Sequence, residues 1–275
     1  MLGASRSSLA AARTRLAELS QADAGVDLES LSTDLLAVTT LLVQELPLRR
    51  ALAEGSTPTE AKAALLDGLL AERVSPAALS FLKDVVGSRW SRPGNLVDAL
   101  ETLGVLASFE QALTADALDE VEDELFRFAR ILEREGELRD LLQNPYQPDE
   151  RKRSLLTELL GDKVNPVTLR VIVAAATVSV RRRTVGEALD QFSQLAAELR
   201  ERLNARVTLA VEPSPEQLER LGEELARVFG RTMGLRVEID PSIVAGAVIR
   251  VGDQVLDASV ARRLDIARRG LAHTG

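Results

Sequence analysis

The sequence predicts a mainly α-helical protein, with tandem helical bundles followed by a small C-terminal α+β domain. Three observations predict this fold class. Apolar residues recur at steps of three and four through the first 204 residues, as in amphipathic helices. A helical pattern repeats at an offset of 90 residues. From residue 205 onward, apolar and polar residues alternate as they do in half-buried strands.

The composition limits the chemistry that the chain can perform. It has 275 residues, no cysteine and one histidine, His273, close to the C-terminus. Disulfides, thiol catalysis and cysteine-based zinc sites are therefore excluded, and a histidine-based metal site or catalytic triad is not expected. The net charge of −8 argues against a general nucleic-acid binder, which needs a basic surface. We expect no catalytic residue, no cofactor, no metal and no nucleic-acid partner.

No direct membrane span is expected. The longest uncharged stretches, such as 35–44 and 171–180, have about ten residues, whereas a spanning helix needs roughly 20. The amphipathic start of the chain, with Arg and Ser, also fits a transit peptide. The plainer interpretation is a first helix, because Leu9, Ala12 and Leu16 fall on one face.

The repeat aligns two segments of the chain without a gap. LRRAL at 48–52 matches LRDLL at 138–142, and the matched pairs include prolines and a lysine as well as leucines. Shared helical periodicity could align leucines, but not these other residues, so we infer that a helical unit is duplicated. The matched pairs include Leu31 and Val121, Leu35 and Leu125, Pro58 and Pro148, Lys62 and Lys152, Leu66 and Leu156, and Pro76 and Pro166.

Each repeat predicts the same series of helices. A long helix is expected at 27–53 and again at 114–142, followed by a short helix at 58–71 and 148–160. Ser75 and Asn165 then act as N-caps before prolines and open another helix. A final helix closes each unit, at 95–113 and 183–204. The predicted domains are a first bundle at 1–113 and a second bundle at 114–204.

The second long helix is acidic. Residues 114–142 hold ten Asp or Glu and four Arg, and most of the acids lie in the first turns. Acidic residues there suit the positive end of the helix dipole. The helix presents either an ordinary solvated face or an acidic docking face for a basic partner.

Residues 205–275 predict a β-α-β-β-β-α domain. ARVTLAVEP is a strand, and the helix that follows it has Ser214 and Gln217 spaced as a capping box. LRVEID and IVAGAVIRV are two further strands, and a Gly252-Asp253 turn leads into a fourth strand, QVLD. Asp257 or Ser259 then caps a last, arginine-rich helix.

Residues 243–264 resemble the C-terminal signature of the F-type ATP synthase delta subunit family, also called OSCP. The match departs at Ala258, where the family usually has Gly, a residue that adopts a positive φ more readily than alanine does. With its duplicated bundle, the chain resembles the long actinobacterial form. The signature positions are Gly246, Arg250, Gly252, Asp253, Asp257, Ser259, Arg263 and Leu264.

The resemblance implies a non-catalytic subunit of the peripheral stalk. Family members link alpha subunits of the catalytic head to the b subunit, and so resist rotor torque during ATP synthesis. The implied partners are the N-terminal helices of alpha and the end of b. The implied location is the cytoplasmic face of the cell membrane, held peripherally. A duplicated bundle predicts two grooves, each for one amphipathic alpha helix.

Several residues are candidates for partner binding, although each has a plainer interpretation. Trp90 is either an interface anchor or a core residue. Arg181, Arg182 and Arg183 either hold an acidic partner or form a solvated helix end. In the last helix, docking and core roles both remain open for Leu264, Ile266 and Leu271.

Two other classes of protein compete with the stalk subunit. One is a helical adaptor or regulatory protein unrelated to the synthase. The other is an RNA-binding module, suggested by the β-α-β-β-β-α order. The acidic balance and the scarcity of aromatic residues argue against base stacking and therefore against RNA.

Overall fold

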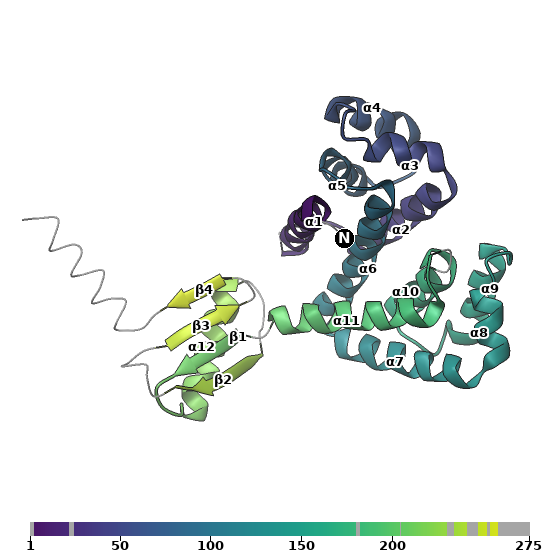
Figure 1. The fold of residues 1–275 in the computed structure, drawn as a ribbon. Coiled ribbons are helices and arrows are strands. Elements are labelled where there is room, and N and C mark those ends of the chain that lie inside the picture. The colour runs from purple at the N-terminus through teal and green to yellow at the C-terminus, as the bar shows by residue number, and fades with distance from the viewer. Residues whose placement is uncertain are drawn as a thin grey trace, which may run out of the picture. The chain divides into compact units, whose positions relative to one another are not determined.

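The computed structural model confirms the predicted fold class (Figure 1). It describes residues 3–21, 25–179, 182–203, 205–229, 234–240, 247–251 and 254–257. The chain divides into two compact units, Met1–Ala196 and Ala197–Gly275, here called the helical unit and the C-terminal unit.

The helices of the helical unit follow the repeat closely. The second to fifth helices each recur 90 residues later, with both ends shifted by that same number. The helices are α1 (Gly3–Gln21), α2 (Leu28–Gln44), α3 (Leu46–Ala53), α4 (Thr59–Leu70), α5 (Pro76–Gly87), α6 (Pro93–Thr114), α7 (Leu118–Arg134), α8 (Gly136–Gln143), α9 (Asp149–Leu160), α10 (Pro166–Thr177) and α11 (Val185–Leu203).

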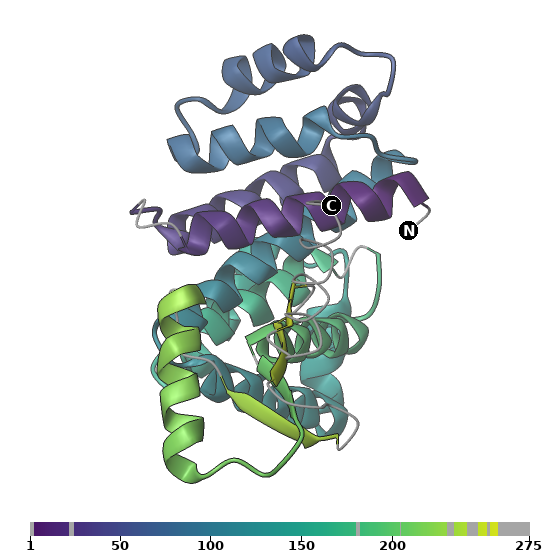
Figure 2. The same cartoon turned by 90° about the vertical axis from the view of Figure 1, so that its left-hand side faces the viewer.

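Helix α6 belongs to both repeats. It follows α5 as the last helix of the first repeat, and it begins 90 residues after α1, where the first helix of the second repeat is due. It packs against α1, α2 and α3 on one side and against α7 and α10 on the other (Figures 1 and 2). Its side chains are buried almost continuously from Leu96 to Ala112. The predicted domain boundary after residue 113 assigned α6 to the first bundle alone. In the structure, α6 packs against helices of both repeats.

The predicted long helices, 27–53 and 114–142, are wrong in detail, because each is two helices. Glu45 and Glu135 break them with the same backbone conformation, ψ of 84° and 83°. Pro47 explains the first break, because a proline lacks the N–H that a continuous helix needs, but is tolerated in a first turn. Gly136, which disfavours a helix interior, begins the helix after the second break. The second segment also starts later than predicted, at Leu118, because α6 extends to Thr114.

Two buried lysines at equivalent positions of the repeats link helices within each repeat. Lys62 in α4 donates from Nζ to the carbonyl of Val86, at 3.2 Å, near the end of α5. Lys152 in α9 donates to the carbonyls of Leu142, at 2.6 Å, and Ala176, at 3.0 Å. These carbonyls lie in last helical turns, which have free acceptors and negative dipole ends. Burial lowers the pKa of Lys62.

An acidic residue also recurs at equivalent positions. Asp34 of α2 accepts the backbone N–H of Ser75 at 2.8 Å, and Glu124 of α7 accepts that of Asn165 at 2.9 Å. Ser75 and Asn165 are the N-caps of α5 and α10, as predicted. Both repeats therefore share a polar contact as well as the apolar stripe. In each repeat, a carboxylate of one helix accepts the N-cap N–H of another and so fixes where that helix begins.

Small residues allow α2 and α6 to approach closely. Ser32 donates to the carbonyl of Gly104 at 2.8 Å, and its Oγ lies 2.6 Å from the Oγ of Ser108. A Cβ added at Gly104 would lie 2.9 Å from Cγ of Leu36. This distance is shorter than real Cβ contacts, so any larger side chain would push the two helices apart.

The C-terminal unit is a four-stranded sheet with one helix on it. The strand order is β2-β1-β3-β4; β2 is parallel to β1, and the other pairs are antiparallel. Helix α12 connects the parallel strands, and its predicted capping box between Ser214 and Gln217 forms. The core is built on Val207, Leu225 and Ile249. The elements are β1 (Ala205–Leu209), α12 (Pro215–Phe229), β2 (Leu235–Ile239), β3 (Ala247–Val251) and β4 (Gln254–Asp257).

The predicted Gly252-Asp253 turn and last helix lie outside the described residues. Among the residues that are described, no single helix is long and apolar enough to cross a membrane. By length and composition, only α2 and α3 taken together reach that threshold, and they are bent by 110°.

Gly104→Ala is expected to destabilise the chain by about 1–3 kcal/mol, because the new methyl group overpacks the α2–α6 contact. Gly68→Ala is the matched control, since Gly68 lies within α4 with nothing near its would-be Cβ. It is expected to stabilise by about 0.5–1 kcal/mol. Urea unfolding followed by circular dichroism at 222 nm measures both changes, and equal effects would contradict the close packing.

Lys152→Met is expected to destabilise the chain by about 2–4 kcal/mol, because it removes the donor to two buried carbonyls. Lys62→Met should cost roughly half of that, because one such bond to a carbonyl is lost. Lys163→Met, at an exposed lysine, is the control and should change stability by less than about 0.5 kcal/mol. The midpoint of thermal unfolding ranks the three variants, and the reverse order for the two buried lysines would refute this account.

Candidate functional site

A groove runs between the two repeats within the helical unit. It has a volume of about 360 Å³ and lies between α2 on one side and α9 and α10 on the other. Apolar residues and threonines make up most of its lining. The lining residues are Glu29, Thr33, Leu36, Ala37, Thr40, Arg153, Thr157, Pro166, Leu169, Arg170, Val173, Ala174, Thr177 and Val178.

An ion pair closes one part of this groove. The Nη2 atom of Arg170 lies 3.0 Å from Oε1 of Glu29, and its Nη1 donates to Gln111 at 2.7 Å. Burial lowers the pKa of Arg170, and the nearby Glu29 carboxylate opposes that effect. The contact joins α2, α6 and α10, so the groove has a polar contact beside its apolar lining residues. Such a surface suits an amphipathic helix.

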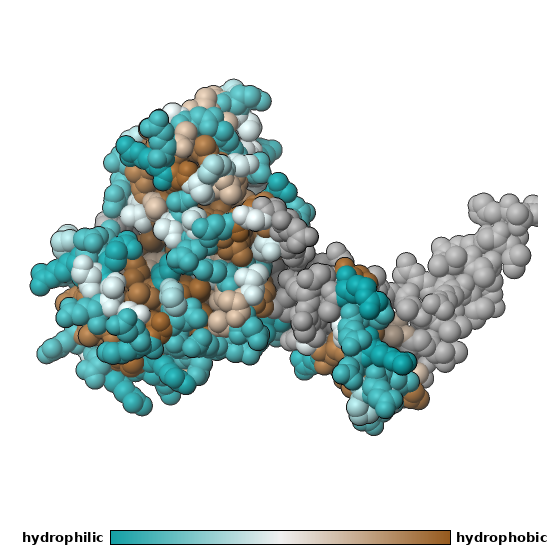
Figure 3. Space-filling view, turned by 180° about the vertical axis from the view of Figure 1, so that it is seen from behind, coloured by the Kyte–Doolittle hydropathy of each residue, from teal (hydrophilic) through white to brown (hydrophobic). Residues whose placement is uncertain are grey.

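Exposed apolar residues occur elsewhere on the helical unit. Leu69 in α4 is 44% exposed, and its equivalent Leu159 in α9 is 39% exposed. Phe126 is 60% exposed, with the guanidinium of Arg130 5.7 Å from its ring centroid. Figure 3 shows brown apolar residues interspersed with hydrophilic ones over one face of the unit. The groove is therefore one of several apolar surfaces open to solvent.

The structure places Trp90 in the interior. It is 7% exposed, and its indole N–H donates to the carbonyl of Val85 at 2.9 Å, in the last turn of α5. Of the two roles considered for this residue, the core role matches its position.

Arg182 and Arg183 lie against α6 and are committed to its carboxylates. Both contact Glu101, which is 1% exposed; the Arg182 Nη2 atom lies 2.6 Å from Oε2. Arg182 also pairs with Asp98, and Ser179 donates to Glu101. Burial raises the pKa of Asp98, and Arg182 acts in the opposite direction.

This cluster buries most of both arginine side chains. Their side chains are 20% and 19% exposed, and the guanidinium of Arg183 also lies 5.9 Å from the ring centroid of Phe192. Removing one partner of a buried ion pair strands the other charge, which typically costs about 3–5 kcal/mol. The cluster thus joins the segment before α11 to the shared helix. The remaining arginine of the triplet, Arg181, lies outside the described residues.

Sequence reasoning missed Glu101 as the centre of this cluster. A signal was present, because Glu101 is a single acid within the apolar run ALETLGVLASF. A charge in such a position requires a buried partner. A comparable signal pointed to Arg170, the single charged residue in the stretch 164–180, but it did not identify Glu29 of α2 as the partner.

Two of the signature residues fall within the described sheet. Arg250 lies in β3 with an exposed side chain, and Asp257 is the last residue of β4. The other signature positions, Gly246, Gly252, Asp253, Ser259, Arg263 and Leu264, lie outside the described residues, as do Ile266 and Leu271. In the part of the chain that is described, no group of three His, Cys, Asp or Glu residues is arranged to hold a metal ion.

Comparison with known proteins identifies relatives over the whole chain. The ATP synthase delta subunit of Streptomyces griseus is 43% identical over 272 residues, covering 99% of this chain and 100% of the relative. That of Acidothermus cellulolyticus is also 43% identical, with the same coverage of both. These alignments include the first repeat.

A solved structure gives a much weaker match. A chain in the cryo-EM structure of the Toxoplasma gondii mitochondrial ATP synthase hexamer is 21% identical, with a TM-score of 0.33. The alignment covers 63% of this chain and 97% of the other. A TM-score of 0.33 is too low to indicate a shared fold over the aligned region.

The family model for the ATP synthase delta (OSCP) subunit matches residues 105–271, more than half of the chain. The match begins within α6, the helix that starts the second repeat. It confirms the resemblance predicted from residues 243–264, and it rules out an adaptor unrelated to the synthase. The chain belongs to the ATP synthase delta (OSCP) subunit family.

Proposed function

We propose that this chain is a stator subunit of the proton-translocating F-type ATP synthase. It links the alpha subunits of the catalytic head to the b subunit of the peripheral stalk, and it resists rotor torque during ATP synthesis. It performs no catalysis itself. Membership of the delta family supports this role, as do relatives that align with 98–100% of this chain's and their own lengths.

The groove between α2 and α10 is the observation that carries the proposal. It offers an apolar floor of Leu36, Leu169 and Val173, bordered by the Arg170–Glu29 ion pair. An amphipathic N-terminal helix of an alpha subunit can bury its apolar stripe there and leave its polar face in water. Because both repeats line the groove, one such helix bound in it would hold the two repeats together.

The buried contacts across α6 suit a part that transmits force. A stator must not yield when the head is pulled by the rotor, so its internal joints need to be stiffer than its attachments. The close α2–α6 packing and the ion cluster at Glu101 provide such joints. The chain would then lie at the cytoplasmic face of the cell membrane, held peripherally through alpha and b.

Ala37→Glu is expected to weaken binding of a synthetic alpha N-terminal peptide by about tenfold or more. Ala37 is an exposed groove residue on α2, and a glutamate there would obstruct the apolar floor and add a charge next to it. Fluorescence anisotropy with labelled peptide from the same organism measures the dissociation constant.

Ala64→Glu makes the same change at an exposed position of α4 that does not line the groove, and it should leave the affinity within about twofold. Failure of the wild-type chain to bind either the alpha peptide or a b fragment would sink the stator proposal. Equal affinities for the wild type and both variants would show that the peptide binds at a surface other than the groove.

A further inference from the structure

Three side chains form a closed ring at the groove, one each from α2, α6 and α10. The Nη2 atom of Arg170 lies 3.0 Å from Oε1 of Glu29, and its Nη1 donates to Oε1 of Gln111 at 2.7 Å. The Nε2 atom of Gln111 in turn donates to Oε2 of Glu29 at 3.1 Å. Glu29 and Arg170 both line the groove. A helix bound in the groove would therefore meet this ring.

Burial divides the ring unequally. The side chain of Arg170 is 14% exposed, whereas that of Glu29 is 58% exposed. Burial lowers the pKa of Arg170, so the carboxylates of Glu29 and of nearby Asp27 offset the burial only in part. Asp27 is itself the N-cap of α2 and accepts the N–H groups of Glu29 and Ser30. Arg170 is thus the fixed member of the ring, and Glu29 is the member that can turn towards solvent.

Covering the groove would change what Arg170 needs. A guanidinium has five N–H donors, and the contacts with Glu29 and Gln111 use two of them. While the groove is open, water reaches the exposed part of this side chain. An apolar stripe laid over the groove would remove that water, and a buried charged donor without an acceptor is costly. A carboxylate on the bound helix would supply both the acceptor and the opposite charge.

The two repeats differ at this position. The buried lysine recurs in both repeats, and so does an apolar residue beside the arginine, because Leu79 is the equivalent of Leu169. Arg170 does not recur, since its equivalent is Ser80, which is exposed. The packing of helices within a repeat therefore does not require an arginine here. The contacts of Arg170 are instead made at the junction of the two repeats, where the groove lies.

The other arginine of the lining agrees with an acidic occupant. Arg153 of α9 is exposed, and its Nε atom lies 3.8 Å from the exposed Glu150, one turn earlier. An exposed pair at this distance adds little stability and is readily exchanged. In the first repeat the equivalent of Arg153 is Ala63. A basic helix in the groove would meet two lining arginines, whereas an acidic helix would meet one lining carboxylate, that of Glu29.

We propose that Arg170 is the specificity-determining residue of the groove, and that it binds a carboxylate of the bound helix in place of Glu29. This inference rests on the proposed function for the occupant, an alpha N-terminal helix. It adds the chemistry that this helix must carry, which is an acidic residue beside its apolar stripe. In the free chain Glu29 occupies the place of that residue, so it is a competitor as well as a link between the repeats.

The test is a double-mutant cycle between the full-length chain and a labelled alpha N-terminal peptide from the same organism, measured by fluorescence anisotropy. Each Asp or Glu of the peptide is changed in turn to Asn or Gln. One of these changes should weaken binding to the wild type by about tenfold, but binding to Arg170→Gln by less than about twofold. Arg170→Gln should itself weaken binding of the unchanged peptide by about tenfold. Arg170→Lys should weaken it less, because lysine keeps the charge but not the guanidinium geometry.

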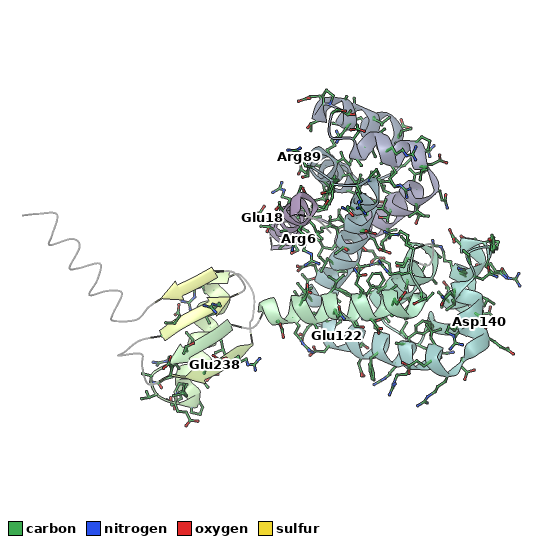
Figure 4. All side chains as sticks on the ribbon, viewed as in Figure 1. Arg6, Glu18, Arg89, Glu122, Asp140 and Glu238 are labelled. Carbon is green, nitrogen blue, oxygen red and sulfur yellow. The ribbon has the colours of Figure 1, made fainter. Side chains whose placement is uncertain are left out.

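Glu29→Gln gives a result that a purely structural role would not. It removes the competing charge from the ring, so the unchanged peptide should bind about three- to tenfold more tightly. The matched control is Glu18→Gln, at a glutamate that Figure 4 labels on α1. Glu18 is as exposed as Glu29 and also pairs with an arginine, Arg15, at 3.2 Å, but it does not line the groove. This control should change affinity by less than about twofold, and circular dichroism establishes that every variant is folded.

The proposal is overturned if Glu29→Gln weakens peptide binding or leaves it unchanged, because the carboxylate would then not be a competitor. It is also overturned if no acidic residue of the peptide couples to Arg170. The stator role would survive both results, since the peptide would still bind. A wild-type chain that does not bind the peptide at all would instead contradict the part of the groove in the proposed function, and this inference would then be wrong as well.

Discussion

The helical unit depends on one helix that is buried on two sides. Helix α6 completes the first repeat and begins the second, so its side chains must fill two cores at once. A helix in that position has no solvated face, which is why its sequence from Leu96 to Ala112 lacks the usual amphipathic stripe. It also has to accept close neighbours, and Gly104 and Ser108 provide the room on the side of α2.

The polar contacts are arranged around this constraint. Side-chain packing places a helix between its apolar neighbours, and hydrogen bonds add directional contacts that specify one position along its axis. Ser32 fixes α6 against α2, and Glu101 fixes it against the arginines that precede α11. Further out, Lys62 and Lys152 fasten the ends of the shorter helices to each other. Apolar burial supplies most of the stability, whereas these polar groups specify one arrangement.

Much of the fold could be predicted from the sequence, because periodicity and end signals agree. The offset of 90 residues, the N-caps Ser75 and Asn165 and the capping box of α12 all occur as expected. The breaks at Glu45 and Glu135 were missed, because apolar spacing continues through a bend while only Pro47 and Gly136 reveal it. The sharing of α6 depends on tertiary contacts between distant segments, which no local pattern encodes. The lone Glu101 indicated a buried partner, but not that Arg182 and Arg183 are that partner. For the candidate site, the sequence predicted two grooves, one for each repeat, whereas the groove described here is lined by residues of both repeats.

The shared helix also has a consequence for how such a chain can change in evolution. Two domains joined by a linker can be separated, shuffled or lost as independent pieces. Here the loss of either repeat would expose one whole side of α6, including leucines and valines that now lie in a core. A shorter descendant would need many simultaneous substitutions along that helix to stay soluble. Because α6 is both the last helix of the first repeat and the first helix of the second, the loss of one repeat would be difficult once the longer form existed.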